Sequence, residues 1–270
     1  MKKQISVALL VSTFDRPKAL RTVLRSVATQ SVLPDEILIA DDGSDLHTRA
    51  VIEDFRESTE IVVKHFWQKN DGFQKAVILN KAVAGTRCDY IVQIDGDVVL
   101  HQNFIEDHVS ASEKGYFLRG SRVVLNEGKT NRVIDADMPV RISPFDKGIQ
   151  NRINSLRIPL IAPFMDKYSK RSDNMHGCNC SYWRLDFVKV NGYNNVFKGW
   201  GHEDIELAAR FINAGLSQKK IKLRAVCYHL YHAVAERSRV ETNFRFYEDC
   251  VRSGNKFCLN GYSQHHAYNY

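Results

Sequence analysis

Two carboxylates one residue apart are the clearest candidates for chemistry in this sequence. Asp95-Gly96-Asp97 directly follows the apolar run at residues 90–94. Carboxylate oxygens are the ligands that Mg²⁺ and Mn²⁺ prefer, and both side chains could approach one ion. Such an ion neutralises phosphate charge, so the pair predicts a metal that holds a diphosphate leaving group. The alternative is a solvated turn, since Asp-Gly is a common turn dipeptide.

A second acidic pair lies in the stretch Gly199-Trp200-Gly201-His202-Glu203-Asp204. Acidic residues are stabilised in the first turn of a helix, so Glu203 and Asp204 could simply be capping residues. Capping does not explain the tryptophan flanked by glycines. The face of Trp200 could cover the apolar C–H groups of a sugar. Asp204 could then take a proton from an acceptor hydroxyl as a general base.

Three further polar clusters have weaker patterns. Asp42, in Asp41-Asp42-Gly43-Ser44, either caps a helix or accepts hydrogen bonds from a base or ribose. His229 and His232 follow the last predicted strand, and either imidazole could join carboxylates on a metal. A lone histidine is more often a surface or core residue, so the choice between the two stays open. Ser12-Thr13 ends the first predicted strand.

The elements that must position these residues alternate along the first hundred residues. Apolar runs predict strands, and i, i+3, i+4 spacing predicts helices between them. This alternation predicts right-handed βαβ units and a mostly parallel sheet, with ligands at the carboxyl ends of the strands. Three of those ends carry the polar clusters, which we therefore expect to converge. The predicted strands are 5–12, 36–40, 61–66 and 90–94, and the predicted helices follow Pro17 and surround 51–55 and 76–83.

The pattern loosens after residue 100. We predict a strand at 115–125, an insertion or lid at 126–173, and regular structure again at 181–190. A helix at 204–214 has an apolar stripe that ends at a glycine. A last strand is predicted at 222–228, and a loose tail at 263–270.

Bulk composition sets the broad class. The chain has 270 residues, with 44% hydrophobic and 26% charged residues, which is near the average for a soluble globular protein. Its formal charge of +7 suits an anionic partner, either a nucleotide diphosphate or a phospholipid surface. No nucleic-acid-binding module is recognisable, so we expect no nucleic-acid partner. Six scattered cysteines predict free thiols and a cytoplasmic location, peripheral on the membrane at most. Met1-Lys2-Lys3 precedes too short an apolar run for a signal peptide.

Together the motifs resemble those of the family 2 glycosyltransferases. Residues 11–17, 40–44, 95–97 and 199–204 occur in the family's order, and the last resembles bacterial chondroitin-polymerase modules with a galactosyltransferase-type C-terminal half. The resemblance implies an α/β GT-A fold with a Rossmann-like, mostly parallel central sheet flanked by helices. Residues 1–100 would be the nucleotide-sugar-binding half of one continuous domain. Residues 101–270 would be the acceptor-binding half.

The resemblance also implies an activity and a set of site residues. The reaction would be inverting transfer from a UDP-sugar of the galactose, N-acetylgalactosamine or glucose type. The acceptor would be a hydroxyl of a glycan or lipid-linked glycan, in surface polysaccharide or lipopolysaccharide synthesis. Asp204 would be the base, with Glu203 and Trp200 shaping the acceptor site. Mn²⁺ or Mg²⁺ would be held by Asp95, Asp97 and His229. The donor would contact Ser12, Thr13, Asp42, Lys75, Asp95, Gly96, Asp97 and Asn179.

Two other classes share part of this pattern. A sugar-phosphate nucleotidyltransferase would have a similar nucleotide half, but residues 12–17 lack the glycines of its phosphate loop. A non-catalytic glycan-binding protein would have no need of the carboxylate sets. The family also often carries an arginine near the start of the helix after Gly72, where this chain has Gln74-Lys75.

Overall fold

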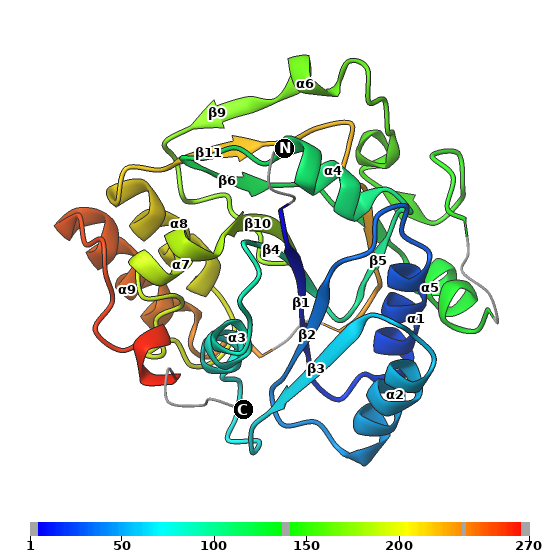
Figure 1. Cartoon of the computed structure of the whole chain (residues 1–270), viewed down its shortest axis with the longest axis horizontal. Coiled ribbons are helices and arrows are strands. Elements are labelled where there is room, and N and C mark those ends of the chain that lie inside the picture. Colours follow the sequence, from blue (N-terminus) through cyan, green and yellow to red (C-terminus); the bar gives the residue numbers. More distant parts are fainter. Residues whose placement is uncertain (1–4, 137–140, 234–235, 266–270) are drawn as a thin grey trace.

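A single eight-stranded sheet crosses the molecule (Figure 1). The computed structural model describes residues 5–136, 141–233 and 236–265. The strand order is β3-β2-β1-β4-β10-β6-β11-β9, and the first four strands are parallel. β10 runs antiparallel to both of its neighbours. The strands are β1 (Val7–Thr13), β2 (Glu36–Asp41), β3 (Val62–Trp67), β4 (Tyr90–Asp95), β6 (Tyr116–Arg119), β9 (Lys167–Ser169), β10 (Asn179–Trp183) and β11 (Ser217–Lys220).

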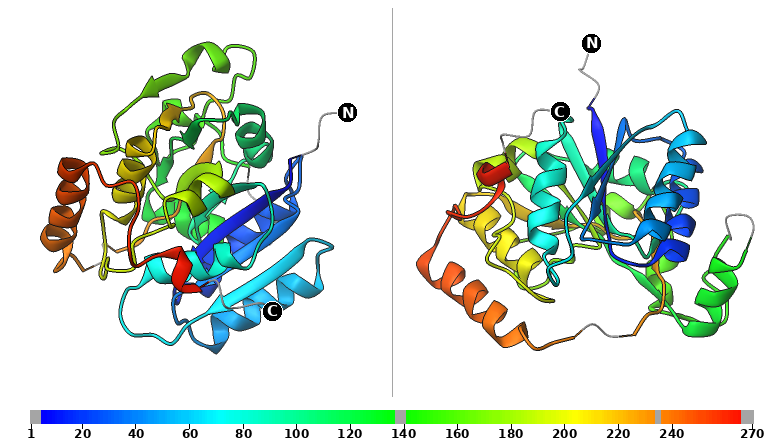
Figure 2. Two further views of the ribbon diagram at one scale, coloured as in Figure 1. Left: turned by 60° about the vertical axis from the view of Figure 1, so that its left-hand side comes forward. Right: turned by 90° about the horizontal axis from the view of Figure 1, so that it is seen from below.

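Helices cover both faces of this sheet (Figure 2). The alternating side chains of β1 show why: Leu9 and Val11 enter one apolar core, and Ala8 and Leu10 enter the other. A strand buried on both faces reads as a continuous apolar run, as β1 does. α1 and α2 cover the first face, α3, α7 and α8 cover the second, and α9 packs outside α8. The helices are α1 (Pro17–Ala28), α2 (Leu46–Glu57), α3 (Lys75–Ala84), α4 (Phe104–Ala111), α5 (Glu127–Ile134), α6 (Ala162–Met165), α7 (Arg184–Lys189), α8 (Glu203–Asn213) and α9 (Val240–Ser253).

A smaller sheet lies beside the first, in the order β5-β12-β7-β8. Its inner residues belong to the same apolar core as α1, so the two sheets form one body. Two 3₁₀ turns complete the fold. The elements are β5 (Val98–Leu100), β7 (Val123–Leu125), β8 (Ile149–Gln150), β12 (Cys227–His229), η1 (Arg152–Ser155) and η2 (Tyr262–His265).

The first hundred residues fold as predicted, but three later predictions are wrong. The strand predicted at 115–125 is two strands, β6 in the large sheet and β7 in the small one. Of the strand predicted at 222–228 only the end is a strand, in β12, because Leu223 and Ala225 have positive φ angles of 55° and 50°. The predicted loose tail is structured at residues 263–265, where His265 is buried. Residues 266–270 and Met1-Lys2-Lys3 lie outside the described residues.

Two features of the second half were not predicted. β9 lies inside the predicted insertion yet pairs with β11, so part of that segment belongs to the main sheet. α9 has no counterpart among the predicted elements. All six cysteines are buried free thiols, as predicted. Among the described residues, no helix has the length and apolarity needed to cross a membrane.

Candidate active site

The carboxyl ends of the parallel strands meet as predicted. Ser12 is paired with Asp95 across β1 and β4, and Thr13 is paired with Asp41 across β1 and β2. Gly96 is required at this junction, because a Cβ there would lie 2.9 Å from the Ser12 carbonyl oxygen. The Gly96 amide donates to that oxygen at 2.7 Å. The end of β4 is thereby fixed against the end of β1.

Asp42 lies at this edge but its carboxylate is occupied by the chain itself. Its two oxygens accept hydrogen bonds from the Gln68 side chain at 2.6 Å and the Gln74 amide at 2.7 Å. Burial raises the pKa of Asp42 despite these two donors. Thr13 is also buried, and its carbonyl oxygen accepts from the Asp42 amide at 3.0 Å. Asp42 therefore holds the start of α3 in place, whatever else it contacts.

Lys75 and Ser12 both contact Asp95. The Lys75 Nζ atom lies 2.5 Å from Oδ1 of Asp95, and the Ser12 hydroxyl donates to the same oxygen at 2.7 Å. Burial acts to raise the pKa of Asp95, but the Lys75 charge and the hydrogen bonds from Lys75 and Ser12 together outweigh it, and the pKa is lowered. Asp95 is therefore an ionised carboxylate that already has a cationic partner. The charges of Glu203 and Asp204 also help to raise the pKa of Lys75, so both acidic residues lie within electrostatic range of it.

Asp97, His229 and His232 form a separate cluster. One potential ligand atom from each lies within 4.8 Å of the others. Nε2 of His229 is 3.7 Å from one Asp97 oxygen, and Nε2 of His232 is 3.4 Å from the other. Arg16 also pairs with Asp97, at 2.7 Å. Asp95 is outside this cluster, and the second histidine is inside it.

The donor set of this cluster fits a divalent ion. Oδ1 of Asp97 is buried and has no hydrogen-bond partner. Burial lowers the pKa of His229, which keeps its imidazole neutral as metal ligation requires. Nδ1 of His232 lies 2.7 Å from the Ala233 carbonyl oxygen, an arrangement that fixes the ring and leaves Nε2 for a ligand. Carboxylate oxygen with imidazole nitrogen suits Mn²⁺ among other divalent metals.

Glu203 and Asp204 begin α8 and face Lys75. The Gly177 amide donates to Oδ2 of Asp204 at 2.9 Å, and the Ile205 amide donates to Oδ1 at 2.8 Å. Burial nevertheless raises the pKa of Asp204. Burial and the Asp204 charge raise the pKa of Glu203 to about 7, and its Oε2 atom has no partner. A carboxylate with a raised pKa is a stronger base, which suits proton abstraction near neutral pH.

The loop before α8 is held by a residue that the sequence did not single out. Asn243, fully buried on α9, donates to the carbonyl oxygens of Lys198, Gly199 and Gly201 at 3.1, 3.4 and 3.0 Å. The loop presents Trp200, which is 42% exposed and therefore free to cover a ligand. Asn243 was missed because an asparagine on a helix has no signature outside its three-dimensional contacts.

Asn179 does not join the site. Its side chain is 1% exposed, and its amide nitrogen donates to the Ser121 and Ala225 carbonyl oxygens. Its Oδ1 atom is 2.9 Å from Nε2 of His108. With every polar atom used inside the protein, Asn179 links the two sheets and has none left for a donor sugar. The expectation that it binds the donor is therefore wrong for its side chain.

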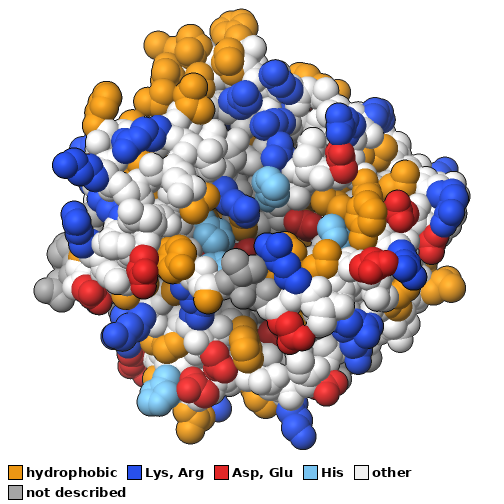
Figure 3. All heavy atoms as spheres, turned by 180° about the vertical axis from the view of Figure 1, so that it is seen from behind, with side chains coloured by type: hydrophobic (Ala, Val, Ile, Leu, Met, Phe, Trp, Pro, Cys, Tyr) orange, Lys and Arg blue, Asp and Glu red, His pale blue; other side chains and the backbone are white. Residues whose placement is uncertain are grey.

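Two arginines and a histidine at this edge were also missed. Arg119 on β6 lies 2.9 Å from His176, and its Nε atom is buried without a partner. Arg122 contacts the Cys178 thiol at 3.2 Å, and the charge of Asp95 contributes to raising the pKa of Arg122. Figure 3 shows the resulting surface: a hollow that contains histidine and acidic side chains, with Lys and Arg around it.

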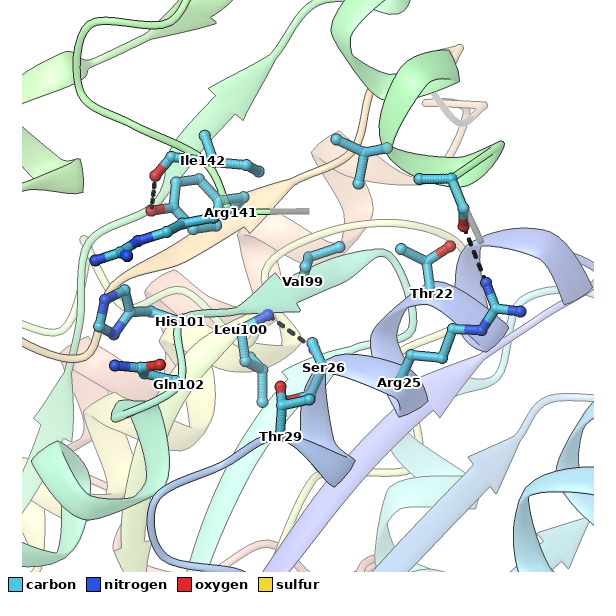
Figure 4. Close-up of a pocket in the computed structure, with 13 residues that line it drawn as sticks. Thr22, Arg25, Ser26, Thr29, Val99, Leu100, His101, Gln102, Arg141 and Ile142 are labelled. Carbon is cyan, nitrogen blue, oxygen red and sulfur yellow. Dashed lines mark hydrogen bonds between the residues drawn. The ribbon is translucent and has the colours of Figure 1, made fainter. Parts of the chain in front are cut away.

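A cavity of about 240 Å³ lies apart from this site, between α1, α5 and the small sheet (Figure 4). Arg25 lines it but donates to the Ala136 carbonyl oxygen at 3.0 Å. Among the described residues that line the cavity, none is acidic. It therefore offers no carboxylate ligand for a metal.

The chain matches a sequence family described as glycosyl transferase family 2 over residues 8–174. The chain belongs to this family. Residues 162–233 also match a family described as the N-terminal domain of galactosyltransferase. This family is the one that the motifs of the sequence resemble.

Relatives of this family 2 chain include synthases of large polysaccharides. It is 21% identical over 230 residues to a chondroitin synthase of Pasteurella multocida, covering 80% of this chain and 24% of that protein. It covers 35% of an Escherichia coli chondroitin synthase, so it spans about a third or less of these relatives. A third relative is UDP-Gal:alpha-D-GlcNAc-diphosphoundecaprenol beta-1,3-galactosyltransferase from Escherichia coli. The two chains are 24% identical, and the alignment covers 95% of this chain and 88% of that protein.

Solved structures confirm the GT-A fold. GalNAc-T7 with UDP, GalNAc and Mn²⁺ has a TM-score of 0.67 at 13% identity, covering 93% of this chain and 50% of that one. The mannosyltransferase PcManGT from Pyrobaculum calidifontis has a TM-score of 0.57 at 13% identity, covering 94% and 64%.

Proposed function

We propose that this chain is an inverting glycosyltransferase that moves a sugar from a UDP-sugar to a hydroxyl group of a glycan acceptor. The observation that carries the proposal is the position of Asp204. Its buried carboxylate, with a raised pKa, lies within electrostatic range of Lys75 and Asp95, which pair with each other at the strand ends where open α/β sheets bind ligands. A base on one side of the donor and charge-neutralising groups on the other are what single displacement requires.

In the proposed reaction Asp204 accepts the proton of the acceptor hydroxyl. The hydroxyl oxygen then forms a bond to the anomeric carbon of the donor, while the bond from that carbon to the UDP oxygen breaks. UDP leaves with the bonding electrons, and the configuration inverts. The Gly177 and Ile205 amides orient the Asp204 carboxylate by donating to its two oxygens. Glu203 and Trp200 lie on the same loop–helix junction and shape the acceptor site.

Asp97, His229 and His232 would hold Mn²⁺ or Mg²⁺. A divalent ion bound there neutralises the charge that develops on the leaving diphosphate. Asp95 keeps Lys75 ordered in the site through their 2.5 Å contact. We place Asp95 second to the histidines as a metal ligand, because its Oδ1 atom already accepts from Lys75 and Ser12.

A relative that aligns over most of both chains supports a choice of substrates. It is named for a UDP-galactose donor and a diphosphoundecaprenol-linked acceptor. We therefore propose a donor of the galactose, N-acetylgalactosamine or glucose type, and a lipid-linked glycan acceptor. Such a reaction would belong to surface polysaccharide or lipopolysaccharide synthesis.

A donor and acceptor screen tests the proposal. Purified protein is incubated with Mn²⁺, one UDP-sugar and an N-acetylglucosamine diphospho-lipid, and released UDP is measured. We expect UDP release with one donor and its loss on chelation of the metal. Pyrophosphate formed from UTP and a sugar phosphate would instead identify a nucleotidyltransferase. Glycan binding without turnover of any donor would identify a binding protein.

A further inference from the structure

α6 projects from the edge of the molecule (Figure 1), and exposed apolar side chains gather on and beside it. Leu160 is 88% exposed and Phe164 is 87% exposed, with Ile161 at 46% and Met165 at 42%. Within α6 only Ala162 is buried. Contiguous exposed apolar residues on a soluble protein mark a surface that something else covers. We call this projecting segment, residues 157–171, the apolar arm.

The base of the apolar arm is fixed, so its tip is held outward rather than left loose. β9 pairs with β11 at the edge of the large sheet, and the Ile158 amide donates to the Leu223 carbonyl oxygen at 2.9 Å. Asp166 forms a buried ion pair with Arg224. Pro159 and Pro163 restrict the backbone on either side of the exposed leucine. The apolar side chains therefore stay exposed because the fold presents them.

Charge next to the tip indicates what covers it. Residues 157–171 contain four basic residues, Arg157, Lys167, Lys170 and Arg171, and one acidic residue, Asp166. Arg157 pairs with Asp107, Arg171 with Asp173 and Asp166 with Arg224, so Lys167 and Lys170 have no acidic partner among the described residues, and Lys167 is exposed. Apolar side chains beside unpaired lysines are the pattern of proteins that lie on anionic membranes. A second copy of this chain packed arm against arm would bring these lysines together.

The apolar arm also lies where membrane contact would help the site. In Figure 3, hydrophobic side chains gather along the upper edge, and Lys and Arg lie between them and the hollow. β9 connects the arm through β11 to β6, whose Arg119 borders the site. We propose that the apolar arm inserts into the surface of an anionic lipid bilayer and holds the active-site opening near it. This inference stands apart from the proposed function, since lipid binding needs no sugar transfer.

Vesicle sedimentation tests the proposal on the full chain. We expect the protein to sediment with vesicles of phosphatidylglycerol and phosphatidylcholine, and less with phosphatidylcholine alone. The double variant Leu160→Asp and Phe164→Asp should lower vesicle affinity at least about tenfold, because two apolar anchors are replaced by carboxylates with the same charge as the lipid. Lys167→Gln should lower it by about fivefold, the effect of one basic residue near an anionic surface. Leu259→Asp is the control, since Leu259 is 89% exposed but lies outside the arm.

The exposed positions make a folding failure easy to detect. Both arm side chains are almost fully exposed, so the melting temperature of the double variant should match that of the wild type. Unchanged vesicle binding in that variant would overturn the proposal, as would a wild type that does not bind anionic vesicles. A wild-type dimer that the double variant converts to a monomer, with vesicle binding unaltered, would make the apolar arm a self-association surface instead.

Discussion

Asn243 offers a test of whether α9 serves the site or only the fold. Asn243→Ala removes the amide that donates to the Lys198, Gly199 and Gly201 carbonyl oxygens. The contact at 3.4 Å is weak, so two good hydrogen bonds are lost. Each contributes about 0.5–1.5 kcal/mol net. The loop that carries Trp200 should therefore lose about 1–3 kcal/mol of its stabilisation.

This loss sets the expected kinetic effect. At about 1.4 kcal/mol per tenfold change, the population of the ordered loop relative to open states falls by roughly 5- to 100-fold. If the ordered loop is needed for transfer, kcat/KM falls by up to the same factor, because acceptor binding and the Asp204 position both depend on the fraction of molecules with the loop ordered. The assay is UDP release at varied acceptor concentration, alongside thermal unfolding.

Asn213→Ala is the matched control. The Asn213 amide donates to the Cys250 and Asn255 carbonyl oxygens at 3.3 and 2.8 Å, so it also links α8 to the α9 region, but away from the loop. We expect both variants to lower the melting temperature by a similar amount and only Asn243→Ala to lower kcat/KM. Equal kinetics in the two variants would refute a positioning role for Asn243.

Three further changes test other parts of the structure. Asp204→Asn should lower kcat by roughly 10²–10⁴-fold while leaving UDP affinity unchanged, because a general base is lost and the donor contacts are not; a rate equal to that of the wild type would remove Asp204 from proton transfer. Glu203 has a pKa of about 7, above its ordinary value of 4.5, so the folded chain keeps a proton that the unfolded chain releases. Its contribution to stability is complete below about pH 4.5 and is lost as the pH rises through 7, so Glu203→Gln should flatten the fall in melting temperature between about pH 5 and 8. Glu206→Ala strands the fully buried Arg210, whose two nitrogens lie 2.8 and 2.7 Å from the carboxylate, and should lower the free energy of unfolding in urea by about 3–5 kcal/mol.

The predicted and missed elements differ in how locally they are encoded. β1, β2 and β4 are buried on both faces, so each appears in the sequence as a mainly apolar run, which in β4 is interrupted only by Gln93. β11 is Ser-Gln-Lys-Lys, and its Lys219 is buried because Nζ donates to the Ala111 carbonyl oxygen at 3.2 Å. No apolar pattern could reveal a strand of this composition. α9 buries only three residues, among them the polar Asn243.

The residues of the site also differ in how far the sequence could predict them. Motif position was enough to bring Ser12, Asp41 and Asp95 to one edge, because the ends of parallel strands must meet. It could not decide which groups pair there. Lys75 pairs with Asp95, so the metal-compatible cluster consists of Asp97 and the two histidines. Asn179 has a polar side chain of the kind that binds ligands, but it is buried between the sheets. Its burial depends on tertiary packing alone.

Binding of UDP in the presence of Mn²⁺ tests the central claim most directly. Isothermal titration of UDP into the wild type should show binding with Mn²⁺ that is lost on chelation. Asp97→Asn should lose this metal-dependent binding and keep the melting temperature of the wild type. Asp54→Asn, at an exposed carboxylate on α2, should behave as the wild type. Unchanged Mn²⁺-dependent UDP binding by Asp97→Asn would contradict the proposed site.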